Sequence, residues 1–202
     1  MEKEQTEYLL RKLNQVFQDG YRPARGKESY FYSLKNNNRT LVSDMVNCFG
    51  HIFNLRNQQF DDYQIEPPLD KWKTHYYTGF FNDADTHQKR AALMLDFIRE
   101  TGLKVTKCDP AEPVTDFKSW KMALYFNDFD FHCLLEDAPH QWSEKMGTTI
   151  RVNHHHFAIP PLLRTTDNCF FGVGYDLYNT YKITNPHADE NNRYVKDGIL
   201  GR

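Results

Sequence analysis

The sequence contains no long apolar run and no segment typical of protein export. All of its apolar runs fall well short of the roughly 20 residues that a bilayer-spanning helix needs. The first residues, from Met1 to Glu7, are charged and do not have the pattern of a secretory signal peptide. We therefore expect a cytoplasmic protein with no membrane partner.

Cysteine is also scarce, with four residues spread widely along the chain at positions 48, 108, 133 and 169. A disulfide-stapled scaffold of this length would need more cysteines at closer spacing. The pattern fits a reducing compartment.

Neither sign of charge is in large excess, since the formal net charge is −2 and the pI is about 6.5. This balance argues against a broad nucleic-acid-binding surface. Aromatic residues are abundant, with 15 Phe, 12 Tyr and 3 Trp, so we expect a core that depends on aromatic packing. Such a core suits a domain that contains a sheet.

The apolar pattern changes from helical to extended along the chain. Amphipathic helices are expected from Lys3 to Gln18 and from Asp85 to Thr101, and an apolar helix from Ser43 to about Arg56. After Gly102 the apolar residues recur with a period of two, which is typical of strands. The expected strands cover residues 103–108, 120–126, 129–136, 141–145, 148–152, 170–171 and 175–184.

Helices in the first half and strands in the second predict an α+β fold, with N-terminal helices packed on an antiparallel sheet. The length fits one domain or slightly more. We expect an N-terminal helix and connector at residues 1–40, an α+β domain at residues 41–184, and a loosely held polar tail at residues 185–202.

Cys48 is a candidate nucleophile because it lies near the start of the expected apolar helix. Ser43 can cap that helix and Asp44 complements the positive end of its dipole. A helix N-terminus together with a protonated histidine lowers the pKa of a thiol, and the thiolate is the attacking species in cysteine hydrolases. The alternative interpretation is a small thiol that is merely packed in the core.

His132 is the candidate partner, on one of the expected strands. Strand alternation places it on the same face as Asp130 and Leu134, while Phe131 and Cys133 point to the other face. A cysteine on a helix and a histidine on a strand can meet only where the helix end packs against the sheet.

These elements resemble the papain-like hydrolases in the broad sense that includes the NlpC-type enzymes. In that arrangement a cysteine begins a helix and a histidine lies on a following antiparallel sheet. The sequence also resembles a group of uncharacterised bacterial and viral proteins over about residues 45 to 150. The blocks that carry this likeness are Asn47-Cys48, Asp130-Phe131-His132, Glu136-Asp137 and Trp142-Ser-Glu-Lys-Met-Gly147.

The resemblance implies a papain-like peptidase or amidase, or an acyltransferase, that acts on a protein or peptide-like substrate without a cofactor. Cys48 would attack a carbonyl and His132 would transfer the proton. Glu144 would orient the imidazole, although it stands where the related group has a histidine; the alternative is a solvated strand charge. Asn47 or Asn54 would help the helix start to stabilise the oxyanion.

A metal site is the second hypothesis, because His154 and His156 project to one face of a strand. A third ligand could come from His132, Cys133 or Cys169. The sequence contains no paired Cys or His spacing typical of zinc, so we interpret the run as a surface histidine cluster and expect no metal.

The main alternative to the hydrolase is a small non-enzymatic binding protein, such as a phage-type inhibitor of a host defence protein. Asp61, Asp62 and nearby carboxylates would then mimic nucleic acid. An exposed aromatic patch without an accessible Cys48 would favour this function; its expected residues are Tyr76, Tyr77, Phe80 and Phe81.

Overall fold

The structure is a computed structural model of the chain. It describes residues 3–23, 47–53, 84–127, 130–145, 152–156, 158–163 and 174–191. Within these ranges the fold combines helices with an antiparallel sheet, so the expected α+β class is confirmed. None of the helices in these ranges has the length and apolar character needed to cross a membrane.

Two of the expected helices are present with nearly the expected bounds. Helix α1 spans Lys3–Gln18 and helix α5 spans Ala84–Glu100. Gly20 and Gly102 follow them with φ angles of 90° and 87°, a left-handed conformation that glycine adopts without steric cost. The buried face of α1 is formed by apolar residues at helical spacing, namely Leu9, Leu13 and Phe17.

The third helix, α3, is much shorter than expected. It spans Cys48–His51, preceded by Asn47 in an extended conformation. The expected helix from Ser43 to about Arg56 is therefore wrong at position 47, and residues 43–46 and 54–56 lie outside the described part of the chain. The polar side chain of Asn47 caps a backbone N–H, which begins α3 at Cys48.

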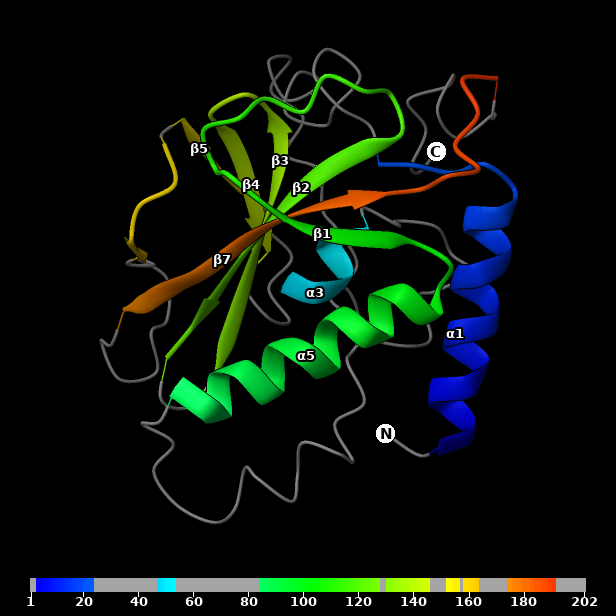
Figure 1. The fold of residues 1–202 in the computed structure, drawn as a ribbon, viewed down its shortest axis with the longest axis horizontal. Coiled ribbons are helices and arrows are strands. Elements are labelled where there is room, and N and C mark those ends of the chain that lie inside the picture. Colours follow the sequence, from blue (N-terminus) through cyan, green and yellow to red (C-terminus); the bar gives the residue numbers. More distant parts are fainter. Residues whose placement is uncertain are drawn as a thin grey trace.

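The described strands form one antiparallel sheet in the order β1-β7-β2-β3-β4-β5, with β6 paired to β7 (Figure 1). Because β7 lies between β1 and β2, the last strand of the sequence pairs with the first two. The strands are β1 Lys104–Cys108, β2 Ser119–Phe126, β3 Phe131–Ala138, β4 Gln141–Lys145, β5 Val152–His156, β6 Leu162–Leu163 and β7 Tyr175–Thr184.

Most expected strands agree with this sheet, and β4 and β7 have the expected bounds. The strand expected at 148–152 extends further than expected, because β5 is described from Val152 through the histidine run to His156. Residues 148–151 and the expected strand at 170–171 lie outside the described ranges.

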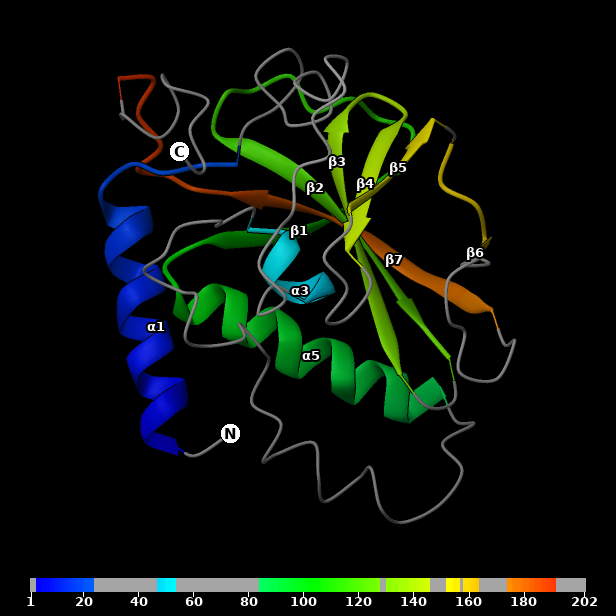
Figure 2. The same ribbon diagram turned by 180° about the vertical axis from the view of Figure 1, so that it is seen from behind.

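Both faces of the sheet are covered. The helices pack on one face, where apolar residues of α1, α3 and α5 form a cluster with alternate residues of β2 and β3 (Figures 1 and 2). The opposite face has a smaller cluster, formed by Ala123, Tyr125, Leu134, Trp142, Leu163 and Tyr175. Cys133 belongs to the first cluster and Leu134 to the second, which agrees with the alternation expected for β3.

The beginning of the expected polar tail is not loosely held. Asn185 is fully buried and its Nδ2 donates hydrogen bonds to the Phe17 and Tyr21 carbonyls, at 2.9 and 2.6 Å. Ala188 is also buried. The chain after β7 is therefore attached to the end of α1, which lies beside it in Figure 1. Residues 192–202 lie outside the described part.

We expect the substitution Asn185→Ala to lower the free energy of unfolding by about 2–4 kcal/mol, since two buried carbonyls lose their donor. Urea denaturation would measure this difference. The matched control is Asn191→Ala, an exposed position where the change should stay within about 0.5 kcal/mol. Equal unfolding midpoints for the two variants would contradict the attachment of this segment to α1.

Candidate active site

The position of Cys48 is set by the cap of α3. The Asn47 Oδ1 accepts a hydrogen bond from the Gly50 N–H at 2.8 Å, and the Asn47 carbonyl accepts one from the His51 N–H at 2.9 Å. These bonds make Cys48 the first residue of the helix. Asn54, the other residue expected near an oxyanion, lies outside the described ranges.

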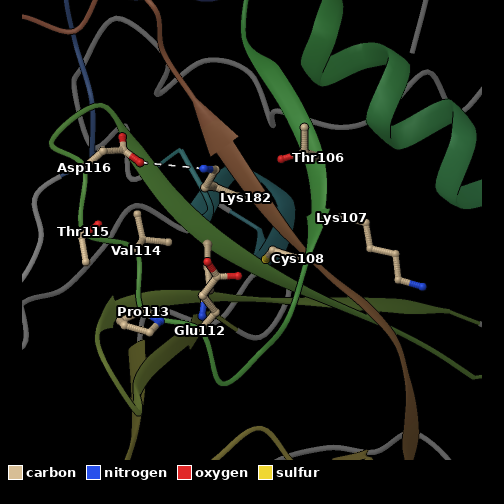
Figure 3. Close-up of a pocket in the computed structure, with 10 residues that line it drawn as sticks. Thr106, Lys107, Cys108, Glu112, Pro113, Val114, Thr115, Asp116 and Lys182 are labelled. Carbon is tan, nitrogen blue, oxygen red and sulfur yellow. Dashed lines mark ion pairs between the residues drawn. The ribbon is translucent and has the colours of Figure 1, made fainter.

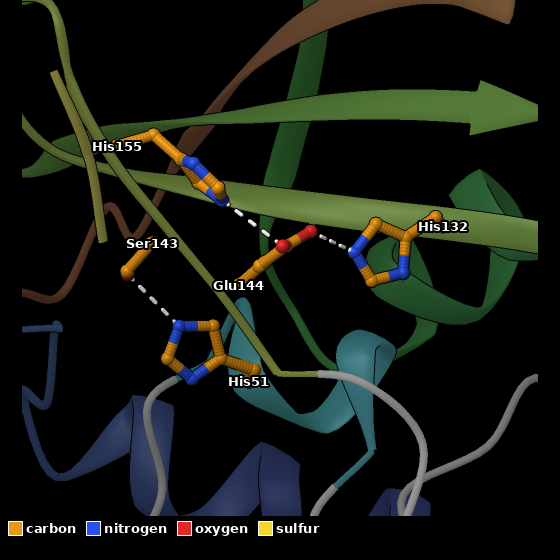
Figure 4. Close-up of polar contacts among 5 residues, drawn as sticks. All are labelled: His51, His132, Ser143, Glu144 and His155. Atoms are coloured by element: carbon orange, nitrogen blue, oxygen red, sulfur yellow. Dashed lines mark hydrogen bonds and ion pairs between the residues drawn. The ribbon is translucent and has the colours of Figure 1, made fainter. Parts of the chain in front are cut away.

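Strand β4 attaches both α3 and the site histidine to the sheet. Its consecutive residues Ser143 and Glu144 point to opposite faces, as strand geometry requires. On the helix face, the Ser143 Oγ lies 2.9 Å from the Nε2 of His51, the last residue of α3. On the other face, Glu144 lies between two histidines (Figure 4).

Each carboxylate oxygen of Glu144 has a histidine partner. Its Oε2 lies 2.5 Å from the Nε2 of His132 on β3, and its Oε1 lies 3.0 Å from the Nε2 of His155 on β5. His132 and Glu144 are both almost fully buried. Because the imidazole Nε2 of His132 faces the carboxylate, its Nδ1 is the nitrogen left for another partner.

That partner is Cys48, which lies close enough to His132 and Cys133 for both side chains to lower its pKa. The start of α3 packs against both β3 and β4.

The contact between Cys48 and His132 shifts their pKa values in opposite directions. The hydrogen bond from Cys133, followed by the hydrogen bond and positive charge of His132, lowers the pKa of Cys48 to about 6 despite burial. Burial opposes the charged form of His132, but its hydrogen bonds to Cys48 and Glu144 raise its pKa to about 10. Both shifts favour a thiolate beside an imidazolium.

The pKa of Glu144 is held well below its usual range. Burial alone would raise this pKa, but the hydrogen bonds and charges of His132 and His155 favour the carboxylate more strongly. Glu144 is therefore ionised wherever the protein is folded at ordinary pH, and it stabilises the imidazolium of His132.

Cys48 is the only one of the three described cysteines whose pKa is lowered. Burial raises the pKa of Cys108 and, together with the neighbouring Cys48, that of Cys133. Cys169 lies outside the described ranges. Cys133 lies beside Cys48 and lowers its pKa, whereas burial raises the pKa of Cys133 itself.

Three contributors to this site were missed from the sequence: His51, Cys133 and His155. The metal hypothesis considered His154 and His156, which share one face of β5, and not His155 on the opposite face. The pairing of β4 with β5 indicates the contact of His155 with Glu144, because Trp142 pairs with His155 and Glu144 pairs with Asn153. Glu144 and His155 are then diagonal neighbours on one face.

The metal hypothesis depends on side chains that lie mostly outside the described part of the chain. The side chains of His154 and His156, and the whole of Cys169, lie outside the described part. Among the residues that are described, no group of three or more His, Cys, Asp or Glu side chains could hold a metal ion.

A separate pocket of about 200 Å³ lies between β1, β2, β7 and the segment after β1 (Figure 3). Its charges are largely balanced within it: the Lys182 Nζ lies 3.9 Å from Asp116, and the Lys121 Nζ lies 2.9 Å from the Pro110 carbonyl and 3.8 Å from Glu136. Its thiol, Cys108, has a raised pKa. The pocket is therefore a weaker candidate for an active site than the group of residues around Cys48.

Comparisons with known proteins give no relative for this chain. No protein-family model, curated protein or solved structure matches it. The assignment of the site therefore rests on its own geometry.

The substitution Cys133→Ala should slow iodoacetamide labelling of Cys48 at pH 6 about fivefold or more. A hydrogen bond to a charged group is worth about 1.5–3 kcal/mol, which corresponds to about one pKa unit or more. Loss of the S–H donor raises the pKa of Cys48 from about 6. Mass spectrometry of each cysteine across a pH series measures the midpoint.

Cys133→Ser is the matched variant, since its hydroxyl can still donate to the thiolate. Cys108→Ala controls for the loss of a distant thiol. If Cys133→Ala and Cys108→Ala leave the Cys48 midpoint equally unchanged, Cys133 does not support the thiolate.

Glu144→Gln should lower the free energy of unfolding by about 3 kcal/mol at pH 7, since one charge of a buried pair is removed. The folded-state pKa of Glu144 is depressed, so its contribution is fully present above the unfolded value of 4.5 and is lost as the pH falls below it. Urea denaturation at pH 7 and at lower pH should show the difference between wild type and variant shrinking.

The exposed pair of Asp96 and Arg99 provides the control, because Asp96→Asn should change stability by less than about 1 kcal/mol. A difference for Glu144→Gln that stays constant as the solution is acidified would show that the carboxylate is not held ionised by the fold.

Proposed function

We propose that this protein is a cysteine-dependent hydrolase or acyltransferase with a papain-like arrangement of its site. The observation that supports the proposal is the chain of contacts from Cys48 to His132 to Glu144. The thiol comes from the start of a helix, the imidazole from a strand, and the carboxylate from the adjacent strand. This is the order in which a nucleophile, a base and an orienting group act.

The first half of the reaction forms a thioester. The Cys48 thiolate attacks the carbonyl carbon of the substrate, and the C=O electron pair moves to oxygen to give a tetrahedral oxyanion. As the carbonyl re-forms, the bond to the leaving amine or alcohol breaks and the His132 imidazolium gives it the proton. Glu144 holds the imidazole so that its Nδ1 faces both the sulfur and the leaving group.

The second half releases the acyl group. His132, now neutral, takes a proton from water, or from an acceptor nucleophile in an acyltransferase, as that molecule attacks the thioester carbonyl. Collapse of the second tetrahedral intermediate expels the Cys48 thiolate and regenerates the ion pair. No cofactor is needed for either half.

The start of α3 supplies the donors for the oxyanion. In the first turn of a helix the backbone N–H groups have no intrahelical acceptor, and the Gly50 N–H is already bound by Asn47. The N–H groups of Cys48 and Phe49 are therefore the donors we assign to the oxyanion. Asn47 acts by positioning the helix start, since its side-chain oxygen is an acceptor and is occupied by the cap.

Cys48 is buried, with 7% of its surface exposed, and Cys133 has no exposed surface. A protein or peptide-like carbonyl is the substrate class that such a thiolate would attack.

The non-enzymatic binding function stays a prediction. Its expected residues are Asp61, Asp62, Tyr76, Tyr77, Phe80 and Phe81, all of which lie outside the described ranges. No described contact specifically favours it.

Acyl transfer from p-nitrophenyl esters and from peptide amides tests the proposal. We expect wild-type protein to carry the acyl group on Cys48, detected by mass spectrometry of proteolytic fragments. Cys48→Ala should abolish this adduct. His132→Ala should slow acylation at neutral pH by about 10²-fold or more, because the proton transfer and the support of the thiolate are lost.

Cys108→Ala is the control and should acylate at the wild-type rate. Acylation of Cys48 that is no faster than that of Cys108, or an equal rate in His132→Ala, would refute an activated nucleophile.

A further inference from the structure

His155 extends the contacts of the site by one more residue. Its Nε2 lies 3.0 Å from the Glu144 oxygen that does not contact His132. A carboxylate only accepts hydrogen bonds, so the nitrogens of both histidines that face Glu144 carry a hydrogen. For His132 this leaves the Nδ1 to exchange its proton with Cys48.

The two histidines approach the carboxylate from different strands. His132 lies on β3, His155 lies on β5, and Glu144 lies on β4 between them (Figure 4). Rotation about the terminal bond of a glutamate side chain is broad when nothing restricts it. A donor on each oxygen restricts this rotation and fixes the plane of the carboxylate.

His155 is also the accessible end of the network. Its side chain is 23% exposed, whereas those of His132 and Glu144 are exposed by no more than 3%. A substitution at His155 therefore removes one contact of Glu144 without opening a large cavity in the core.

Several other ionisable groups surround the same pair. Cys133 and the charge of Asp130 act on Cys48 from β3 and the residue before it. The ring centroid of Tyr175, on β7, lies 5.6 Å from that of His132. Burial, followed by the charge of Glu144, raises the pKa of Tyr125, which stays neutral. All of these groups are unchanged in the variants below.

We propose that His155 is a positioning residue of the site, which holds the Glu144 carboxylate against His132 and so supports the thiolate–imidazolium pair. This inference rests on the proposed function. His155 does not contact the reacting atoms; it acts through Glu144.

The test compares His155→Leu, which removes the donor, with His155→Gln, whose side-chain N–H group can donate to the same oxygen. In His155→Leu, the pH midpoint for iodoacetamide labelling of Cys48 should rise. Labelling at pH 6 should be about fivefold slower, as expected for a lost hydrogen bond to a charged group. His155→Gln should stay within about twofold of wild type. His187→Leu, at an exposed histidine near the end of α1, is the control.

The outcomes separate this inference from the proposed function. If His132→Ala shifts the Cys48 midpoint and His155→Leu does not, the role of His155 is refuted and the hydrolase proposal stands. If the pH midpoint for labelling of wild-type Cys48 equals that of an ordinary thiol, the hydrolase proposal itself is refuted. If the Leu and Gln variants are equally slow, His155 serves packing, and its positioning role is refuted. Urea denaturation of each variant identifies any loss of folding.

Discussion

The buried carboxylate of Glu144 is the constraint on which the arrangement of the site depends. An ionised group away from water is very costly unless donors surround it. Glu144 meets this requirement with imidazoles from the strands on either side of its own. Three neighbouring strands must therefore keep one register, because a slip of a single residue would turn the carboxylate or a histidine to the other face.

The same strand also fixes a helix that could not persist alone. A helix of one turn has almost no intrinsic stability, because its nucleation is unfavourable. α3 forms because Asn47 caps it, His51 contacts Ser143, and the Phe49 ring packs on Phe97 and Phe131 at 5.7 and 6.4 Å. The place of Cys48 is thus determined by tertiary contacts on both sides of the thiol.

This dependence explains which features could be predicted from the sequence. The periods of α1, β4 and β7 are local properties, so their bounds were predictable, and alternation correctly separated Cys133 from Leu134. The start of α3 was not predictable, since Ser43 and Asn47 are both good caps and only tertiary packing distinguishes them. The position of β5 and the contact of His155 depend on a hairpin register across residues 146–151, which no local pattern specifies.

The charges of the site explain why the pKa of Cys48 is lowered although the thiol is buried. Burial alone raises a thiol pKa, as it does at Cys108. At Cys48 the thiolate meets an S–H donor and an imidazolium, and the imidazolium meets a carboxylate that is itself held by His155. Each charge has an opposite charge or a donor beside it, so the low dielectric strengthens these contacts instead of removing the charges. Among the described cysteines, only Cys48 therefore has a lowered pKa.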